Sequence, residues 1–548
     1  MLDDALIDSL FADDLPEVDD WERRYPPRDL PDAAHVTRFA PSPTGSVHIG
    51  GLYVAMVCQD LARRSGGRYL VRIEDTDRAR EVPGALEGFR RAFAYAGLDP
   101  DEGVDTGGAY GPYRQSEREA IYHSFARHLL RRGRAYLCFA TKDDLAALAA
   151  RQESLKVPTG YYGEWALWRD ADPARVRAAL DEKRPYVVRF RSPNEAGRAR
   201  YEDAIRGRLE HEANRNDVVL LKASDASPRL PTYHFAHAVD EHLMRVTTVV
   251  RGEEWLSSVP LHRQLFAALG IEPPRYAHVA PLMKLVPGGR RKLSKRHDPE
   301  AGVDFYLAAG YPAEAVLHYL RGLANGRLMD LPQAQALAAP LALDQFGTAG
   351  PLVDLPKLDD LSADHVAGMS GPEVAAAVSA WARTHDPEVA DVLAAEPDLT
   401  LRALSVEREG VDNPRKDLWT WSGFRAAYGF FFPTLFTLLA GPEDERVTTA
   451  GLPGAAAGPF VRDLVASYRH LDDQGEWFDQ IRQASARHGF APSPKVYKKD
   501  PDAYVGSIRD AAQLVRVAVT GSTRSPDLHA ISRALGEEEF LRRLRPLT

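Results

Sequence analysis

The stretch HVTRFAPSPTGSVHIGG, from His35 to Gly51, constrains the fold of this chain more than any other part of its sequence. It begins with apolar, β-favouring residues, and Pro41, Pro43 and Gly45 then interrupt any regular element. The segment that follows, LYVAMVCQDLARR, has apolar residues at helical spacing. A strand, a loop of small residues and a helix N-terminus together form an arrangement that binds phosphate. The stretch therefore predicts an α/β nucleotide-binding fold, with a histidine at the start of the helix.

Composition limits the classes of protein to which this chain can belong. A chain of 548 residues is expected to form several domains, and 44% hydrophobic with 27% charged residues is ordinary for globular proteins. No apolar run is long enough for a bilayer, and the acidic N-terminus does not resemble a secretory signal, so we expect a cytoplasmic protein without membrane contact. The net charge of -9 argues against non-specific coating of nucleic acid but is compatible with local basic patches. Cys58 and Cys138 belong to no CxxC or Cys/His cluster, so we expect neither structural zinc nor a disulfide.

The predicted secondary structure changes along the chain. Residues 1–33 are acidic and rich in Pro and Asp, and we expect an extension, flexible or draped over the surface. From His35 the pattern is α/β, with a second strand within Gly66–Asp77 and a later strand that ends at Val250. Residues from about 135 to 230 are mixed, and those after about 310 show mainly helical periodicity. The sequence predicts a split α/β domain with an insertion, followed by a long helical region.

His48 is the first candidate for chemistry. Small residues around it, Gly45, Gly50 and Gly51 among them, allow a nucleotide to approach closely. His48 could donate a hydrogen bond to a phosphoryl oxygen and stabilise charge that develops in a transition state. The alternative is an ordinary turn with a solvent-facing histidine, and the loop alone does not separate the two readings.

A basic loop, Arg290–Asp298 (RRKLSKRHD), is the second candidate. Flexible ammonium groups such as those of Lys292 and Lys295 suit a triphosphate whose charge shifts during a reaction. An ordinary basic loop or an RNA contact would leave the same pattern. The lysines within 495–499 form another basic patch, for which a solvated surface is the default interpretation.

Two arginines form the third candidate. Arg38 would point from the end of the first strand into the crevice where open α/β sheets bind ligands, and Arg251 ends another predicted strand. Together they could hold an anionic small substrate by bidentate hydrogen bonds, with the Tyr233 hydroxyl closing the pocket. The alternative for Arg38 is a salt bridge to Glu74, which we expect whatever the substrate is.

At this point six motifs, in order, resemble one family. PSPTGSVHIGG resembles the HIGH-type signature of class I aminoacyl-tRNA synthetases, and KLSKR, about 240 residues later, resembles their KMSKS loop. The phrases RFAPSPTG, GGRYLVRIEDTDR, GPYRQSER, LPTYHFA, VVRGEEWLSS and RKLSKRHD are similar to glutamyl-tRNA synthetase of the discriminating bacterial type. The resemblance is strong over 35–320, patchy from 320 to 500, and returns over 505–545, where LVRVAVTGSTRSPDL is similar to the family's anticodon-binding region.

The resemblance implies the fold and its division. It implies an α/β class: a Rossmann-type nucleotide-binding domain with an inserted acceptor-binding domain, followed by an all-helical anticodon-binding region. The implied parts are an acidic extension (1–33), the first half of the catalytic domain (34–117), a connective insertion that binds the tRNA acceptor end (118–230), the second half of the catalytic domain (231–288), the KMSKS loop with a stem-contact domain (289–375), and the helical anticodon-binding domain (376–548).

The resemblance also implies a reaction and its participants. ATP activates L-glutamate as an adenylate, and tRNA(Glu) then accepts the glutamyl group, with Mg²⁺ accompanying ATP and no structural zinc. We expect a monomer. The implied catalytic residues are His48 and Lys295. The implied ATP-binding residues are Pro43, Gly45, His48, Gly50, Gly51, Trp255, Leu256, Lys292 and Lys295. The implied glutamate-binding residues are Arg38, Ser42, Glu74, Tyr233, His237 and Arg251, and Arg415 is the implied anticodon reader.

Several positions depart from the family pattern. His237 stands where bacterial members usually have a small or amide residue, and a histidine there resembles the glutaminyl branch, whereas Arg251 favours glutamate. The segment Tyr161–Asp170 stands where some members carry a cysteine-bearing zinc segment. Three alternatives therefore stay open: a glutaminyl or non-discriminating enzyme that also charges tRNA(Gln), a specialised paralogue supplying glutamyl-tRNA to a dedicated pathway, and a related nucleotidylyltransferase.

Overall fold

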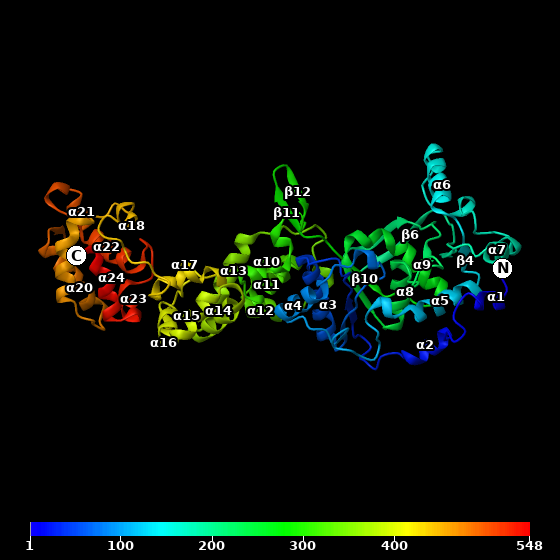
Figure 1. The fold of residues 1–548 in the computed structure, drawn as a ribbon, viewed down its shortest axis with the longest axis horizontal. Helices are drawn as coiled ribbons and strands as arrows, with labels where there is room; N and C mark the ends of the chain where they lie inside the picture. The colour runs from blue at the N-terminus through cyan, green and yellow to red at the C-terminus, as the bar shows by residue number, and fades with distance from the viewer. Residues whose placement is uncertain (1) are drawn as a thin grey trace. The chain divides into compact units, whose positions relative to one another are not determined.

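The computed structural model describes residues 2–548, with Arg80 described by its backbone alone (Figure 1). The chain divides into two compact units: unit 1 comprises Met1–Phe305 and Leu317–Asp354, and unit 2 comprises Tyr306–Val316 and Leu355–Thr548. Within residues 2–548, every helix is too short or too polar to cross a lipid bilayer. The domain boundaries expected from the resemblance remain predictions.

Unit 1 is built on a seven-stranded sheet with the order β3-β2-β1-β9-β10-β6-β7. The strands are β1 (Val36–Phe39), β2 (Arg68–Val71), β3 (Glu102–Gly103), β6 (Arg198–Asp203), β7 (Gly207–Glu212), β9 (Thr248–Gly252) and β10 (Arg275–Val279). β1 runs parallel to both β2 and β9, and β10 runs parallel to β9. The chain leaves β1 for β2 on one side and returns to β9 on the other, which is the kind of switch point where open α/β sheets bind ligands.

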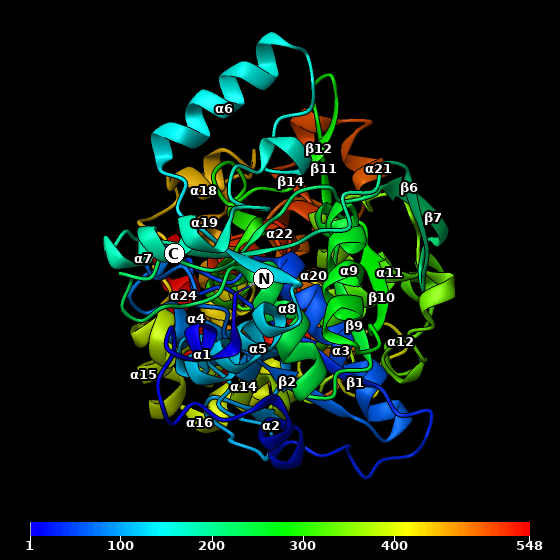
Figure 2. The same ribbon diagram turned by 90° about the vertical axis from the view of Figure 1, so that its right-hand side faces the viewer.

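The expected insertion is joined to this sheet. β6 and β7 lie within residues 118–230, and β6 continues the sheet by pairing in parallel with β10 at Tyr276 and Asp203. The remaining strands of the insertion form a separate antiparallel sheet: β4 (Ala135–Cys138), β5 (Val187–Phe190) and β8 (Val219–Leu221). Its helices are α5 (Glu119–Arg131), α6 (Lys142–Ser154) and α7 (Pro173–Asp181), and α6 stands away from the sheet in Figures 1 and 2.

The opening stretch forms β1, a loop and α3 (Ile49–Ser65), as the sequence predicts. All four residues of β1 are buried, and α3 packs against β1, β2 and β9. His48 is the N-cap of α3, and Gly66 ends the helix in the left-handed conformation at φ 72°. A Cβ at Gly67 would lie 1.9 Å from the His35 carbonyl oxygen, so the return from helix to strand requires a glycine there.

The N-terminal extension is part of unit 1. It contains α1 (Asp4–Asp8) and α2 (Val18–Arg24), which both contact α5 (Figure 1). Trp21 and Tyr25 are buried at 8% and 1% exposure, and the Trp21 indole N–H donates to the Ser124 hydroxyl at 2.9 Å. Arg28 forms an ion pair with Glu102. Of the two expectations for residues 1–33, draping over the surface is therefore correct, because aromatic side chains anchor the segment.

The second half of the α/β domain supplies the remaining wall of the site. α8 (Tyr233–Leu243) packs against α9 (Val259–Leu269), and β9 extends to Gly252 rather than ending at Val250. β11 (Met283–Val286) and β12 (Gly289–Lys292) form an antiparallel hairpin, and β12 contains the first residues of the basic loop. The other helices of unit 1 include α4 (Ala85–Ala96) and α12 (Gln333–Ala338), while α10 (Val303–Ala309) and α11 (Ala313–Ala324) cross the division between units.

Unit 2 is mainly helical, as expected for the C-terminal region. Its helices are α13 (Leu355–Ala367), α14 (Gly371–His385), α15 (Pro387–Ala395), α16 (Pro397–Ser405), α17 (Phe424–Tyr428), α18 (Glu445–Thr448), α19 (Gly458–Ser467), α20 (Gln474–Arg487), α21 (Pro494–Tyr497), α22 (Ile508–Thr520), α23 (Leu528–Leu535) and α24 (Glu537–Leu544). The two-residue strands β13 (Phe490–Ala491) and β14 (Gly506–Ser507) pair in parallel. These elements share a core of their own, with Trp477, Phe540 and Leu514 fully or almost fully buried.

Candidate active site

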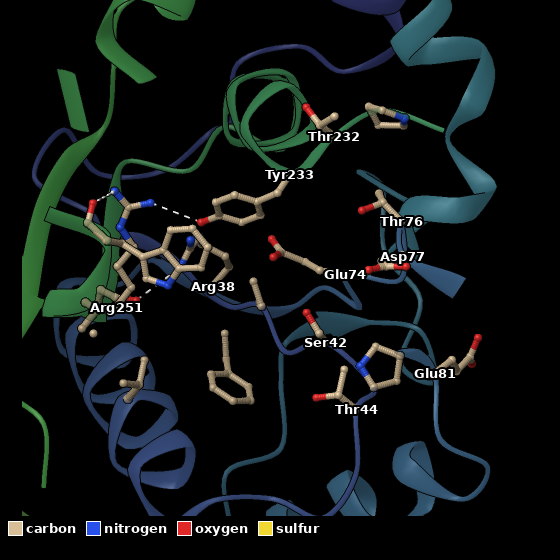
Figure 3. A pocket seen from close by; sticks show the side chains of 18 of the residues that line it. Arg38, Ser42, Thr44, Glu74, Thr76, Asp77, Glu81, Thr232, Tyr233 and Arg251 are labelled. Carbon is tan, nitrogen blue, oxygen red and sulfur yellow. Dashed lines mark hydrogen bonds between the residues drawn. The ribbon is translucent and has the colours of Figure 1, made fainter. Parts of the chain in front are cut away.

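A cavity of about 660 Å³ lies at the switch point of the sheet (Figure 3). Its walls come from the carboxyl ends of β1 and β9, the turn after β2, and the first residues of α8. Seven of the residues expected at the site line this cavity: Arg38, Ser42, Pro43, Glu74, Tyr233, Arg251 and Trp255. Segments far apart in the sequence thus converge at the point where the strand order of the sheet reverses, as the topology requires.

His237 does not line the cavity. It lies one helical turn after Tyr233 on α8, is fully buried, and contacts the Tyr276 hydroxyl at 3.0 Å and Glu241 at 3.2 Å. Burial lowers the pKa of His237 to about 3, although Glu241 acts in the opposite direction. A neutral imidazole behind Tyr233 therefore supports the wall of the cavity, and direct contact with a ligand, which the sequence predicts, does not fit this position.

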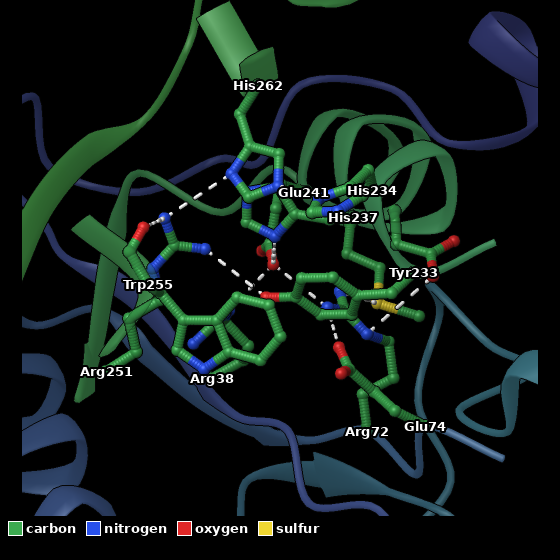
Figure 4. A network of polar contacts seen from close by, with 12 residues as sticks. Arg38, Arg72, Glu74, Tyr233, His234, His237, Glu241, Arg251, Trp255 and His262 are labelled. Carbon is green, nitrogen blue, oxygen red and sulfur yellow. Dashed lines mark hydrogen bonds and ion pairs between the residues drawn. The ribbon is translucent and has the colours of Figure 1, made fainter. Parts of the chain in front are cut away.

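Arg38 is neutralised from within the protein. Its side chain is buried, and its Nε donates to the Glu241 carboxylate at 2.7 Å (Figure 4). The expected salt bridge from Arg38 to Glu74 is wrong, because Glu74 pairs with Arg72 at 2.9 Å instead. The register explains this outcome: Arg38 lies opposite Leu70 on β2, so Arg72 rather than Arg38 is placed nearest to Glu74.

Arg72 and Glu241 join these groups into one buried network. The guanidinium of Arg72 is fully buried and contacts Glu74 and Glu241, each at 2.9 Å, and Asp240 at 3.7 Å. Burial would raise the pKa of Glu241, but the charges of Arg38 and Arg72 hold it well below its usual range. Sequence reasoning missed Arg72 and Glu241; the available signal was an arginine inside an apolar strand, which requires buried partners.

Glu74 reaches the cavity from this network. Burial raises its pKa, and the neighbouring Arg72 and Arg38 act in the opposite direction. Its carboxylate points toward the Tyr233 ring in Figure 3, and both residues line the cavity. A carboxylate in that position can accept hydrogen bonds from a ligand ammonium group.

Arg251 has a different environment. Its side chain is 6% exposed, and its nitrogens contact only neutral groups: His278 Nε2 at 3.0 Å, the Tyr233 hydroxyl at 3.3 Å, the Trp255 carbonyl at 3.4 Å and His262 Nδ1 at 3.4 Å. Within residues 2–548, no described carboxylate oxygen lies within 4.0 Å of its guanidinium. The cavity is therefore lined by a nearly buried cation without an ion-pair partner, which favours an anionic ligand.

Histidines surround Arg251. His262 Nε2 contacts His234 Nδ1 at 2.9 Å, and Figure 4 shows His234, His237 and His262 grouped above Tyr233. Burial lowers the pKa of His262 well below its usual value, with the neighbouring His237 and Arg251 adding to the effect. Burial likewise lowers the pKa of His234 to about 4. These imidazoles are therefore neutral near pH 7 and can accept hydrogen bonds from a guanidinium.

The two signature loops meet beside the cavity. His48 Nδ1 accepts a hydrogen bond from the Gly50 N–H at 2.9 Å, and His48 Nε2 lies 3.3 Å from the Leu293 carbonyl. Lys295 Nζ donates to the Ser46 carbonyl at 2.5 Å. Burial lowers the pKa of His48, while its contact with Leu293 opposes that shift. A neutral His48 with its proton on Nε2 satisfies both contacts at once, so the structure brings the two expected catalytic residues together.

The other expected ATP-binding residues have contacts of their own. Gly45 adopts φ +126°, a conformation that favours glycine, and a Cβ at Gly51 would lie 3.3 Å from the Phe39 ring. Lys292 lies 3.7 Å from Glu254, and the Leu256 carbonyl accepts from the Tyr201 hydroxyl at 3.1 Å. The basic loop is held by Asp298, which accepts from Arg291 at 2.5 and 2.7 Å and from the Ser294 N–H at 3.0 Å. Pro287 and Gly288 form the hairpin turn before it, and Gly288 and Gly289 both have positive φ, at 92° and 147°.

Arg415 is held inside unit 2. It is 9% exposed, donates to Asp417 at 2.5 and 3.0 Å and to the Ala427 carbonyl at 3.1 Å, and lies 4.3 Å over the Tyr428 ring. These internal contacts argue against the expected role in reading an anticodon base, which needs a free guanidinium edge.

Comparison with known proteins places the chain in a family. The family model for class I tRNA synthetases (E and Q), catalytic domain, matches residues 35–332, and an anticodon binding domain model matches residues 506–547. The fold, the two loops and these matches define a class I aminoacyl-tRNA synthetase.

Similar proteins identify the branch. The chain is 40% identical to the glutamate–tRNA ligase of Sorangium cellulosum (strain So ce56), over 96% of this chain and 97% of the relative. It is 39% identical to the glutamate–tRNA ligase of Acetivibrio thermocellus, over 99% of each chain. The chain therefore belongs to the glutamyl-tRNA synthetase family, which confirms the resemblance seen in the motifs.

Solved structures agree with this placement. The crystal structure of a glutamate tRNA ligase from Elizabethkingia meningosepticum in complex with its amino acid matches 93% of this chain and 98% of that chain, at 28% identity and a TM-score of 0.75. The glutamate-tRNA synthetase structure from Elizabethkingia anophelis matches 93% of this chain and 99% of that chain, at 27% identity and a TM-score of 0.73.

Proposed function

We propose that this chain ligates L-glutamate to tRNA(Glu), using ATP and forming a glutamyl-adenylate intermediate. In the first step an α-carboxylate oxygen of glutamate attacks the α-phosphorus of ATP, and the bond to the leaving diphosphate breaks. In the second step a ribose hydroxyl of the terminal tRNA adenosine attacks the acyl carbon and releases AMP. The observation that carries the proposal is the nearly buried Arg251 guanidinium, which lacks an ion-pair partner among the described residues and faces the cavity.

The pocket suits an amino acid with an acidic side chain. Arg251 can bind one carboxylate by charge-assisted hydrogen bonds, and Glu74 can accept from the α-ammonium group. A neutral amide in place of that carboxylate would leave Arg251 buried without a counter-charge, which discriminates by several kcal/mol. Glu241 offsets the charge of Arg38 and holds its Nε, so Arg38 can contribute only the N–H groups that Glu241 and the Val250 carbonyl leave free.

No side chain is needed as a covalent nucleophile. His48 and Lys295 lie where the two loops meet, and each can donate a hydrogen bond to phosphate oxygens once the loops separate around ATP. Their contribution is orientation and stabilisation of the charge on the leaving diphosphate. Within residues 2–548, no cluster of three metal-ligating side chains is present, so Mg²⁺ would arrive with ATP and be held largely by phosphate oxygens.

A charging assay tests the proposal directly. Purified tRNA(Glu) and tRNA(Gln) are each incubated with the protein, ATP, Mg²⁺ and labelled glutamate or glutamine. Labelled glutamate on tRNA(Glu) is the expected product. Attachment of neither amino acid would end the proposal, and attachment of glutamine in preference to glutamate would move the chain to the glutaminyl alternative.

Replacing Lys295 by Ala tests the role of the basic loop. The loss of one ammonium at the developing charge should lower the rate of adenylate formation by about a hundredfold or more, with tRNA affinity changed much less. ATP–diphosphate exchange in the presence of tRNA and a filter-binding measurement separate the two quantities. Arg296→Ala, at an exposed neighbouring position, is the matched control; equal losses of exchange and tRNA binding in Lys295→Ala would contradict the assigned role.

A further inference from the structure

Asp203 and His278 form a buried pair behind Arg251. Asp203 ends β6 and His278 lies in β10, and the two strands run side by side in parallel. Both side chains have no solvent exposure, and Asp203 Oδ2 lies 2.6 Å from His278 Nδ1. The same carboxylate accepts backbone hydrogen bonds from Ile205 and Arg206 at 3.0 Å and from His278 at 3.1 Å. Its oxygens are thus fixed by several donors.

The pair sets the tautomer of His278. Because an ionised carboxylate can only accept, the His278 proton must lie on Nδ1, and Nε2 keeps its lone pair. That lone pair accepts the Arg251 Nε–H at 3.0 Å. Burial and the charge of Arg251 lower the pKa of His278 even though Asp203 acts to raise it. Asp203 is therefore one neutral imidazole away from the guanidinium, and not in contact with it.

This separation has a consequence for the ligand. A carboxylate in direct contact with Arg251 would neutralise it, as Glu241 does for Arg38, and a substrate carboxylate would then have to compete. An imidazole acceptor fixes the Nε edge of Arg251 and leaves its charge uncompensated. The same logic, a carboxylate orienting a histidine that in turn orients a cation, operates at histidine-ligated metal sites.

We propose that Asp203 and His278 are positioning residues that set the preference for an acidic over an amide side chain at Arg251. The proposal rests on the function proposed above and extends it to residues outside the cavity. Asp203 fixes the ring, and His278 holds the Nε edge of the guanidinium. The Nη atoms make only long contacts of 3.3–3.4 Å to neutral groups, which a ligand carboxylate can replace.

Asp203→Asn tests the first link. Asn Oδ1 can keep the backbone bonds from Ile205 and Arg206, which places its NH₂ group against His278 and drives the ring proton to Nε2. Two N–H groups then face each other between His278 and Arg251. We expect the KM for glutamate to rise about tenfold or more and the ratio of kcat/KM for glutamate over glutamine to fall, with the KM for ATP unchanged. The control is Asp463→Asn, which alters an Asp–His pair in unit 2 where Asp463 contacts His488 at 3.0 Å; all constants should stay at wild-type values.

Two replacements of His278 separate positioning from packing. His278→Gln keeps an acceptor oxygen in reach of the place of Nε2, whereas His278→Phe fills the space without an acceptor. We expect Gln to retain most of the glutamate preference and Phe to lose it, with equal KM values for ATP. This comparison decides the proposal if Asp203→Asn folds poorly. An unchanged glutamate-to-glutamine ratio in all three variants, or a parallel rise in the KM for ATP, would overturn it. Failure of the wild-type protein to charge glutamate would instead overturn the proposed function.

Discussion

The two arginines at the cavity have opposite surroundings. Arg38 lies against carboxylates: Glu241 holds its Nε, and Arg72 beside it pairs with both Glu241 and Glu74. Arg251 contacts imidazoles, a hydroxyl and a carbonyl, and none of these carries a negative charge. The sequence shows the same feature at both positions, an arginine at the end of a predicted strand. In the structure Arg38 is paired with a carboxylate in the wall of the cavity, whereas the charge of Arg251 is available to a ligand. The difference lies in the partners and not in the arginines themselves.

Glu241→Gln should give the largest effect on folding. The change leaves Arg38 and Arg72 buried with one carboxylate fewer, and breaking buried pairs of this kind costs about 3–5 kcal/mol. The free energy of unfolding, measured by urea titration, should fall by that amount. The control Glu87→Gln, which weakens the exposed pair with Arg90 at 3.2 Å, should cost about 1 kcal/mol or less. Equal costs in the two variants would erase the contrast between the buried network and the surface.

Arg251→Gln should affect catalysis and leave folding intact. The kcat/KM for glutamate should fall by at least about a hundredfold, the equivalent of about 3 kcal/mol, because the ligand carboxylate loses its cation. The free energy of unfolding should change by less than about 1 kcal/mol, since removing a buried cation without an ion pair also removes its desolvation cost. Steady-state kinetics and urea titration of the same preparation give both numbers. A stability loss as large as that of Glu241→Gln would show that Arg251 is structural too.

The free energy of unfolding should fall in acid because His237, behind the cavity, is buried in its neutral form. His237 has a pKa of about 3 in the fold against 6.5 unfolded, so between those values the unfolded chain binds a proton that the folded chain does not. The stability that neutral His237 provides is complete above pH 6.5 and is lost as the pH falls toward 3, by about 1.4 kcal/mol per pH unit. His237→Gln should make the fall in unfolding free energy between pH 7 and pH 5 shallower. An identical slope in wild type and variant would contradict the neutral, buried imidazole.

Tyr233→Phe should give the smallest effect. The change removes the hydroxyl that accepts from Arg251 at 3.3 Å and leaves the ring packed against Trp255, with the ring centroids 4.3 Å apart and the ring planes tilted by 36°. This bond is long, so we assign it the net value of an ordinary hydrogen bond, about 0.5–1.5 kcal/mol, and the KM for glutamate should rise by roughly two- to tenfold. Phe keeps the aromatic ring and therefore the packing against Trp255, so the free energy of unfolding should stay close to that of the wild type. A KM unchanged from wild type would show that the imidazoles alone orient Arg251.

The sequence could predict the cavity wall because its residues follow strands. Arg38 and Arg251 are each the last residue but one of their strands, β1 and β9, and parallel strands bring their carboxyl ends to one edge whatever the details of packing. His48 and Lys295 were found from short local patterns of small and basic residues. Such features depend on neighbours in the sequence, and they transfer to the structure without knowledge of the tertiary contacts.

The partners of these residues could not be predicted in the same way. His278 meets Asp203, 75 residues earlier in the chain, only because a strand of the inserted region joins the main sheet beside β10. Glu241 contacts Arg38 because α8 is rotated about its axis so that this side chain faces the sheet. The register of β1 with β2 places Arg72, and not Arg38, beside Glu74. Trp21 and Tyr25, two aromatics four residues apart in an acidic segment, were a usable signal that the N-terminal extension is anchored.

The contacts between the signature loops end on the main chain. His48 faces the carbonyl of residue 293, and Lys295 donates to the carbonyl of residue 46. Every amino acid supplies a carbonyl, so natural variation at positions 46 and 293 can proceed without removing either contact, whereas variation at 48 or 295 removes one at once. A search pattern for distant members of such a lineage should therefore keep the histidine and the second lysine fixed and allow any compatible residue at the positions opposite them.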